Sequence, residues 1–128
     1  MLIRTGLTDD IITYLGQDIG SYFTGGFAIL DSEMVTDFTE TYGDMGLRDT
    51  PTVPLYVYKG VLDQISPVND TDALVSKYCA AGATITYQRN STSDHLSEES
   101  AGEPAAFAWL QDRVNGIPAP SGCTTTTV

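Results

Sequence analysis

Two β-type runs alternate with two helical patterns in the second half of the chain, and this order limits the fold more than any other feature. Residues 55–58 form a β-branched and aromatic run, which is typical of a buried strand. A helical pattern follows over residues 69–81, and residues 83–89 alternate as a second strand. A final helix is expected over residues 103–115, with Pro104 in its first turn. The order predicts a parallel α/β sheet.

Residues 1–50 have a different pattern, because they are acidic and show no β-type alternation. Thr8 is predicted to cap a first helix, which the Gly25–Gly26 pair ends. A second helix is expected to start near Asp31 or Ser32, and Gly43 and Gly46 end it. Such helices either cover a neighbouring surface as a lid or contribute to a core. The apolar residues at helical spacing are Ile11, Ile12, Leu15 and Ile19 in the first helix and Met34, Val35, Phe38 and Tyr42 in the second.

The charge and hydropathy of the chain argue against a nucleic-acid partner and against a transmembrane segment. The formal net charge is −11, and the 6 Lys and Arg residues are spread singly along the sequence. A phosphate-binding surface needs clustered bases, so we expect no nucleic-acid partner. No apolar run approaches the roughly 20 residues of a membrane-spanning helix, so no transmembrane segment is expected.

Other features are typical of a secreted protein. The chain has two cysteines, and it has glycosylation sequons at Asn69 and Asn90. The first residues do not form a signal peptide, because Arg4 interrupts them and no long apolar stretch follows. We therefore expect a secreted protein whose signal peptide is missing from this chain.

An aspartate and the one histidine of the chain follow the two predicted strands. Asp63 lies just beyond the first strand, and His95 lies in the polar loop after the second. In a parallel sheet both loops lie at the same edge, so the carboxylate could hold one imidazole nitrogen while the other accepts a proton. This is the chain order of the last two members of a Ser, Asp, His triad in α/β-hydrolases. The alternatives are an incidental surface histidine, or Asp94 as its partner.

The two cysteines, Cys79 and Cys123, are predicted to form a disulfide. A metal site would need more ligands at closer spacing, and a catalytic cysteine would need a neighbouring base. The bond would hold a tail, residues 118–128, against the first helix of the α/β half.

Several motifs in order resemble one family, the fungal secretory lipases of the Candida antarctica lipase A type, over residues 51–128. The loop Gly60-Val61-Leu62-Asp63-Gln64-Ile65-Ser66-Pro67-Val68 is similar to the acid loop of α/β-hydrolases. The other motifs are Pro54-Leu55-Tyr56-Val57-Tyr58-Lys59, Lys77-Tyr78-Cys79-Ala80-Ala81-Gly82-Ala83, Asp94-His95-Leu96 and Trp109-Leu110-Gln111-Asp112-Arg113, followed by Gly116 and Cys123.

The resemblance implies the C-terminal portion of an α/β-hydrolase. Residues 1–50 would be the end of a helical lid or cap, residues 51–117 the βαβα part of the core, and residues 118–128 the tail. It also implies a triacylglycerol lipase that needs no cofactor, in which Asp63 orients His95 as the catalytic base. The acylglycerol ester is the expected substrate.

The chain departs from the family in one respect: no serine stands in a Gly-x-Ser-x-Gly motif, so the nucleophile is absent. We therefore expect a fragment of a secreted lipase that is inactive alone and whose partner is the missing N-terminal part of the hydrolase. The alternatives are a non-catalytic remnant of the fold, or a fragment of another α/β-hydrolase such as an esterase or peptidase.

Overall fold

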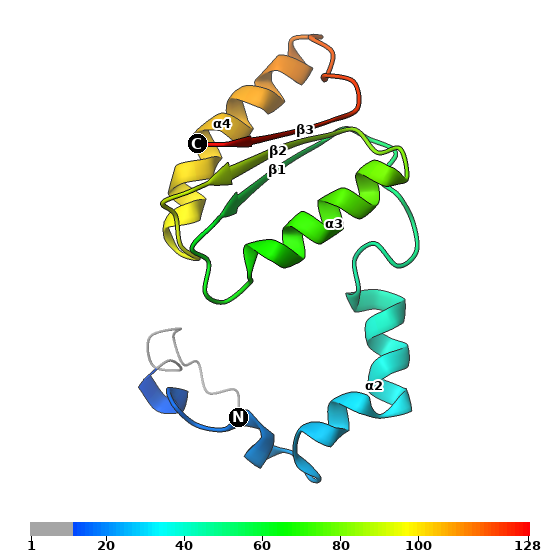
Figure 1. The fold of residues 1–128 in the computed structure, drawn as a ribbon, viewed down its shortest axis with the longest axis vertical. Coiled ribbons are helices and arrows are strands. Elements are labelled where there is room, and N and C mark those ends of the chain that lie inside the picture. The colour runs from blue at the N-terminus through cyan, green and yellow to red at the C-terminus, as the bar shows by residue number, and fades with distance from the viewer. Residues whose placement is uncertain (1–11) are drawn as a thin grey trace. The chain divides into compact units, whose positions relative to one another are not determined.

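The computed structural model describes residues 12–128, and Figure 1 shows their fold. The chain divides into two compact units, Met1–Asp44 and Met45–Val128. The described part of the first unit is helical, and the second unit holds a three-stranded parallel sheet. The predicted cap at Thr8 and the contribution of Ile11 to the first helix lie outside the described residues. No helix within residues 12–128 has the length and hydropathy needed to cross a bilayer.

Short helical segments, rather than two regular helices, build the described part of the first unit. A helical turn at residues 12–14 is followed by four further segments. These are the 3-10 helices η1 (Ile19–Tyr22) and η2 (Gly26–Asp31), the α-helix α2 (Glu33–Phe38) and the π-helix η3 (Thr39–Gly43).

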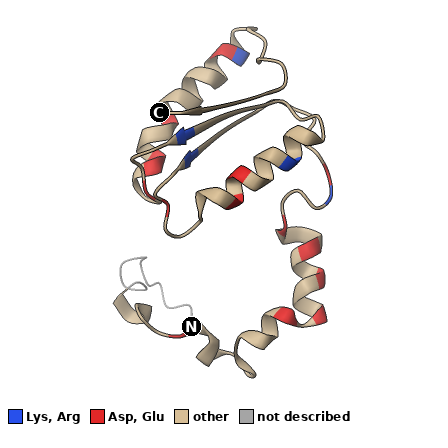
Figure 2. Cartoon of the chain, viewed as in Figure 1, with Lys and Arg blue, Asp and Glu red and all other residues tan. Residues whose placement is uncertain are grey.

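The prediction of one continuous first helix through Ile19 is wrong. Asp18 has an extended backbone, and its carboxylate accepts from the amide of Gly20 at 2.9 Å, so a new turn begins there. The second predicted helix is confirmed, since α2 follows Ser32 and runs through η3 to Gly43. Its acidic residues, and the absence of any Lys or Arg in residues 33–43, are visible in Figure 2.

The second unit contains a sheet with strand order β1-β2-β3, all parallel. The strands are β1 (Leu55–Gly60), β2 (Ile85–Asn90) and β3 (Cys123–Thr127). Leu55 pairs with Ile85 and Gly60 with Asn90, so β1 and β2 end level with each other. The loops that follow these two strands therefore start side by side, as predicted from the βαβ order.

Helices α3 (Val68–Ala80) and α4 (Ser97–Val114) cover the two faces of the sheet, as Figure 1 shows. Leu55 and Val57 pack against the hydrophobic core between the sheet and α3. The buried residues of this core are Val75, Ala83, Ile85 and Tyr87. Tyr56 and Tyr58 point to the other face, where Tyr56 contacts Trp109 of α4 and Tyr58 lies against Gly102. This alternation is the two-residue period of a strand that is covered on both sides.

The final helix starts earlier in the chain than predicted. Instead of starting at Glu103 and Pro104, α4 begins at Ser97 and contains Pro104 in its interior. The reason is local, because Asp94 caps the helix: its carboxylate accepts from the amide of Ser97 at 2.8 Å, and its carbonyl accepts from the amide of Glu98 at 3.1 Å.

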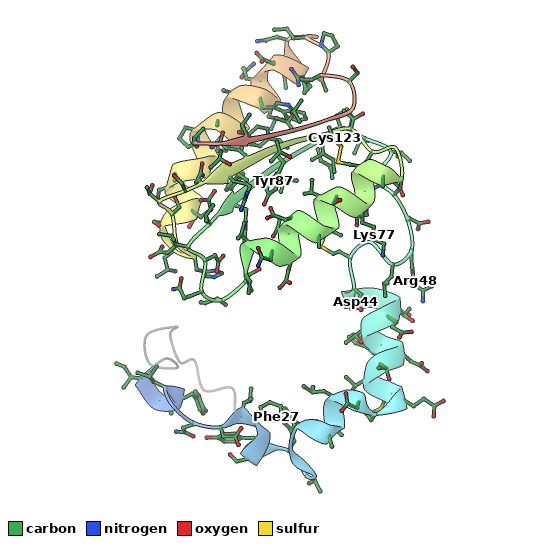
Figure 3. The ribbon with its side chains drawn as sticks, viewed as in Figure 1. Phe27, Asp44, Arg48, Lys77, Tyr87 and Cys123 are labelled. Atoms are coloured by element: carbon green, nitrogen blue, oxygen red, sulfur yellow. A yellow bond between two sulfur atoms is a disulfide. The ribbon has the colours of Figure 1, made fainter. Side chains whose placement is uncertain are left out.

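The tail is also different from its prediction, because it forms a third strand. Residues 123–127 pair in parallel with β2, with Ile85 opposite Cys123 and Arg89 opposite Thr127. The Cys79–Cys123 disulfide is present and joins α3 to the start of β3, with a Cα–Cα distance of 6.0 Å (Figure 3). The bond thus anchors an edge strand rather than an irregular tail.

Candidate active site

The loops that follow β1 and β2 are joined by backbone hydrogen bonds. The amide of Val61 donates to the carbonyl of Asn90 at 2.9 Å, and the amide of Leu62 donates to the carbonyl of Ser93 at 3.0 Å. A Cβ atom at Gly60 would lie 2.5 Å from the carbonyl oxygen of Ser93, so only glycine fits at the end of β1. The close contact holds the loop with Asp63 against the loop that leads to His95.

The carboxylate of Asp63 is fixed by donors from its own loop and strand. Its Oδ1 accepts from the amides of Ile65 and Ser66 at 2.9 and 2.8 Å, and its Oδ2 accepts from Lys59 Nζ at 2.6 Å. The Asp63 side chain is only 5% exposed. The Lys59 ammonium, followed by the Ser66 amide, holds the pKa of Asp63 well below its usual range, so the group is a carboxylate at neutral pH.

His95 lies against this carboxylate. Its Nδ1 atom is 3.1 Å from both Oδ1 and Oδ2 of Asp63, so the predicted hydrogen bond between the two residues is present. An ionised carboxylate can only accept, so in the neutral ring we assign the proton to Nδ1 and the free lone pair to Nε2. The His95 side chain is 39% exposed, so the imidazole is accessible from solvent.

Asp94, the alternative partner of His95, has another role. Its Oδ1 accepts from the amides of Leu96 and Ser97, and from the Ser97 hydroxyl at 2.6 Å. These bonds hold the pKa of Asp94 below its ordinary value, the Ser97 hydroxyl having the largest effect. Asp94, which directly precedes His95, is thus a helix cap that orients the start of α4.

The sequence patterns did not identify Lys59 and Glu98 as members of this site. Lys59 points from the end of β1 to Asp63. Glu98 lies in the first turn of α4, is 7% exposed, and accepts from Asn90 Nδ2 at 2.6 Å. Burial raises the pKa of Glu98, against the effect of Asn90, Ser93 and the Lys59 charge. A glutamate at the start of a helix is ordinarily a solvated residue, so no sequence signal distinguishes this buried one.

The two predicted glycosylation sites differ in their accessibility. Asn69 is exposed in the first turn of α3. Asn90 is 5% exposed, and its Nδ2 atom, to which a glycan would be attached, donates to Glu98. The folded structure therefore argues against the expected glycan at Asn90, because burial within the sheet withholds the amide, and the proposal of glycosylation stays with Asn69.

Within residues 12–128 no group of three or more His, Cys, Asp and Glu side chains is arranged to hold a metal ion. The two bases of the sheet, Lys59 and Arg89, stand beside each other in register, as Figure 2 shows. Each of them is next to a carboxylate, Asp63 at 2.6 Å and Asp72 at 3.4 Å, so their charges are partly balanced.

Known proteins similar to this chain are lipases and esterases. Lipase A of Arthroderma benhamiae is 40% identical over 117 residues, which are 88% of this chain and 24% of that protein. The trichothecene C-3 esterase of Fusarium sporotrichioides is 38% identical over 106 residues, 83% of this chain and 24% of that protein. A Mycobacterium tuberculosis protein named "Probable inactive lipase" is 32% identical over 111 residues, 86% of this chain and 24% of that protein.

The chain therefore spans about a quarter of the length of these relatives. A family model described as "Secretory lipase" matches residues 2–122, which include both loops of the candidate site and both helices of the second unit. The match covers nearly the whole chain, and the similar proteins carry related names. The chain belongs to the secretory lipase family.

Proposed function

We propose that this chain carries the acid and the base of a Ser-His-Asp triad in a carboxylic ester hydrolase, with Asp63 as the acid and His95 as the base. The observation that carries the proposal is the position of His95 Nδ1, 3.1 Å from both oxygens of a buried carboxylate. That contact selects the tautomer whose Nε2 can accept a proton.

In the proposed reaction, His95 Nε2 accepts the proton of a serine hydroxyl while the serine oxygen attacks the ester carbonyl. The ring becomes an imidazolium, which the Asp63 carboxylate stabilises, and His95 then donates the proton to the departing alcohol oxygen. Water then attacks the acyl-enzyme ester and gives a proton to His95 Nε2. His95 returns that proton to the serine oxygen as the carboxylic acid is released. The chain has no Gly-x-Ser-x-Gly motif, so the serine and the oxyanion donors come from a preceding part of the hydrolase.

The substrate is proposed to be an acylglycerol, in keeping with the lipase names among the similar proteins. The Fusarium relative is named as an esterase of a trichothecene, so a smaller ester on a bulky alcohol is the second candidate. Both are carboxylic esters, and the same triad chemistry serves both. The family description and the disulfide support a secreted protein. The proposal for residues 1–50 is a lid or cap of the complete enzyme.

The alternative function is a non-catalytic protein of the same fold, which the relative named as an inactive lipase favours. The two functions differ in what His95 must do. Only the catalytic function requires the Nδ1–H tautomer, because only that tautomer leaves Nε2 free to accept a proton from serine.

Nitrogen NMR of the single histidine tests the proposal in the chain itself. Long-range proton–nitrogen correlations distinguish a protonated ring nitrogen from an unprotonated one, and His95 is the one histidine to assign. We expect the neutral ring to carry its proton on Nδ1. In Asp63→Asn the new amide can donate to Nδ1 and favour the other tautomer. A neutral wild-type ring protonated on Nε2 would contradict the proposed role.

A chimera tests the catalytic step. The segment of Arthroderma benhamiae lipase A that aligns with this chain is replaced by this chain, and hydrolysis of p-nitrophenyl esters is measured. We expect the His95→Ala form to lose about 10³-fold or more in turnover. Gln64→Ala, at an exposed position next to Asp63, is the matched control and should keep the activity of the unmodified chimera. Full activity in the His95→Ala chimera would refute the role of the base.

A further inference from the structure

We propose that Glu98 is a positioning residue for the Asp63–His95 pair, an inference that rests on the proposed function. Glu98 lies in the first turn of α4, the helix that starts directly after His95, and its carboxylate is buried beneath the loops of the site. Through Asn90 it joins that helix to the end of β2. It does not contact the reacting atoms, and it acts by holding the two loops in register.

The carboxylate of Glu98 is the final acceptor of a chain of three side-chain hydrogen bonds. The Tyr56 hydroxyl donates to Gln88 Oε1 at 2.7 Å, Gln88 Nε2 donates to Asn90 Oδ1 at 2.8 Å, and Asn90 Nδ2 donates to Glu98 Oε1 at 2.6 Å. In the opposite direction Glu98 would have to donate, which only a protonated carboxyl can do. An unprotonated Glu98 oxygen therefore sets the orientation of both amides.

The orientation of Asn90 matters because its backbone connects the two loops. Its carbonyl accepts from the amide of Val61 at 2.9 Å and from the amide of Ser93 at 3.4 Å. The Ser93 carbonyl in turn accepts from the amide of Leu62, in the loop that carries the acid. A shift of Asn90 would move both loops, and the space at Gly60 leaves no room for compensation.

The charge of Lys59 favours the ionised form of Glu98. The Lys59 ammonium is largely buried and lies 2.6 Å from Asp63, the carboxylate that compensates its charge. Burial raises the pKa of Glu98, and the Lys59 charge opposes that effect. It therefore favours the carboxylate form of Glu98, which is the form that accepts from Asn90.

Glu98→Ala tests the inference, with Glu99→Ala as the matched control. Glu99 is in the same helical turn and carries the same charge, but it is exposed. Two quantities are measured in the chain: the tautomer of neutral His95, and the hydrogen-exchange rates of the Val61 and Leu62 amides. We expect Glu98→Ala to reduce the Nδ1–H tautomer and to raise both exchange rates about tenfold relative to the control.

A conservative variant separates positioning from general destabilisation. The Gln side chain in Glu98→Gln keeps an oxygen that can accept from Asn90 Nδ2. We expect this variant to retain the wild-type tautomer, with exchange rates within about twofold of wild type. If Glu98→Ala does not fold, Glu98→Asp, which is too short to reach Asn90, takes its place with the same expected changes.

The two proposals fail in different ways. A wild-type ring protonated on Nε2 contradicts the proposed function whatever the Glu98 variants do. A wild-type ring protonated on Nδ1, with an unchanged tautomer and unchanged amide exchange in folded Glu98→Ala or Glu98→Asp, overturns the positioning role and leaves the proposed function standing. Loss of the Nδ1–H tautomer in Glu98→Gln would also overturn the positioning role. This variant keeps an oxygen that accepts from Asn90, so the loss would show that this hydrogen bond does not position His95.

Discussion

A Cβ atom on Gly60 would come within 2.5 Å of the carbonyl oxygen of Ser93, so the end of β1 and the turn after β2 approach each other closely. The contact is between the backbone of β1 and the backbone of the turn after β2, so neither side can move aside as a flexible side chain can. It holds the loop with Asp63 close to the loop that leads to His95.

Gly60→Ala should separate the two loops. The added methyl group has to displace the Ser93 turn, and overpacking of this kind costs about 1–3 kcal/mol of stability. Chemical denaturation measures the free energy of unfolding, and NMR measures the tautomer of His95. Gly43→Ala is the control, because a Cβ at Gly43 would have its nearest neighbour at an ordinary 3.7 Å. Equal stability of the two variants would show that the Gly60 contact can relax.

Asp63 should make stability depend on pH in a defined direction. Its pKa is lowered in the folded state by Lys59 and the Ser66 amide, whereas the unfolded pKa is about 3.9. Asp63 therefore contributes its full stabilisation above the unfolded pKa and loses it as pH falls toward the lower folded pKa. Denaturation of wild type and Asp63→Asn from pH 7 to pH 2.5 should give a stability difference that is constant at high pH and shrinks below about pH 4. A difference that grew on acidification would have the wrong sign.

Removing the disulfide should free β3 before the rest of the sheet. The bond closes a loop with a sequence separation of 44, for which the chain-entropy relation gives roughly 4 kcal/mol. The variant with both cysteines changed to serine, Cys79→Ser and Cys123→Ser, should lose stability of this order. Amide exchange of Ile85, which donates to Gly122, should rise more than that of Leu55, which donates to Thr84. Uniform exchange across both strands would contradict an anchoring role confined to β3.

Gly102→Ala should disturb the packing of α4 on the sheet, at the face opposite α3. A Cβ there would lie 2.0 Å from the Tyr58 ring, so the helix α4 would have to move away from β1 at a cost of about 1–3 kcal/mol. Tyr58→Leu in the same chain should recover part of that stability, since it removes the ring that the methyl group meets. A double-mutant cycle measures the coupling, and additive effects would show that the two positions are independent.

The first unit should open more readily than the second. Apolar side chains of this unit are exposed in the structure, among them Leu15 at 80% and Met34 at 74%. The isolated chain should therefore bind a hydrophobic dye, and hydrogen exchange in residues 12–44 should be faster than in residues 55–114. Equal protection in both units, with a single sharp melting transition, would show that the first unit is stable by itself.

Much of the α/β half could be predicted from local sequence. The β-type run that starts at Leu55 and the alternation around Tyr87 are periodicities of single segments, so they are readable without knowledge of the partners. The end of the helical pattern near residue 81 is confirmed, since α3 ends at Ala80 and Gly82 follows with a φ of +92°. The positions of Asp63 and His95 followed from the same order, because residues after parallel strands meet at one edge of the sheet.

Tertiary structure decided the third strand and the burial of Glu98. The Thr residues of β3 are exposed and show no apolar alternation, so only pairing with β2 makes this segment a strand. The start of α4, by contrast, was set locally by the Asp94 cap, which outweighed the start expected at Pro104. The burial of Glu98 was decided by the side chains around it, in particular the Asn90 amide. Sequence periodicity reports which face of an element is apolar, but a buried charge is defined by the partners that other segments bring to it.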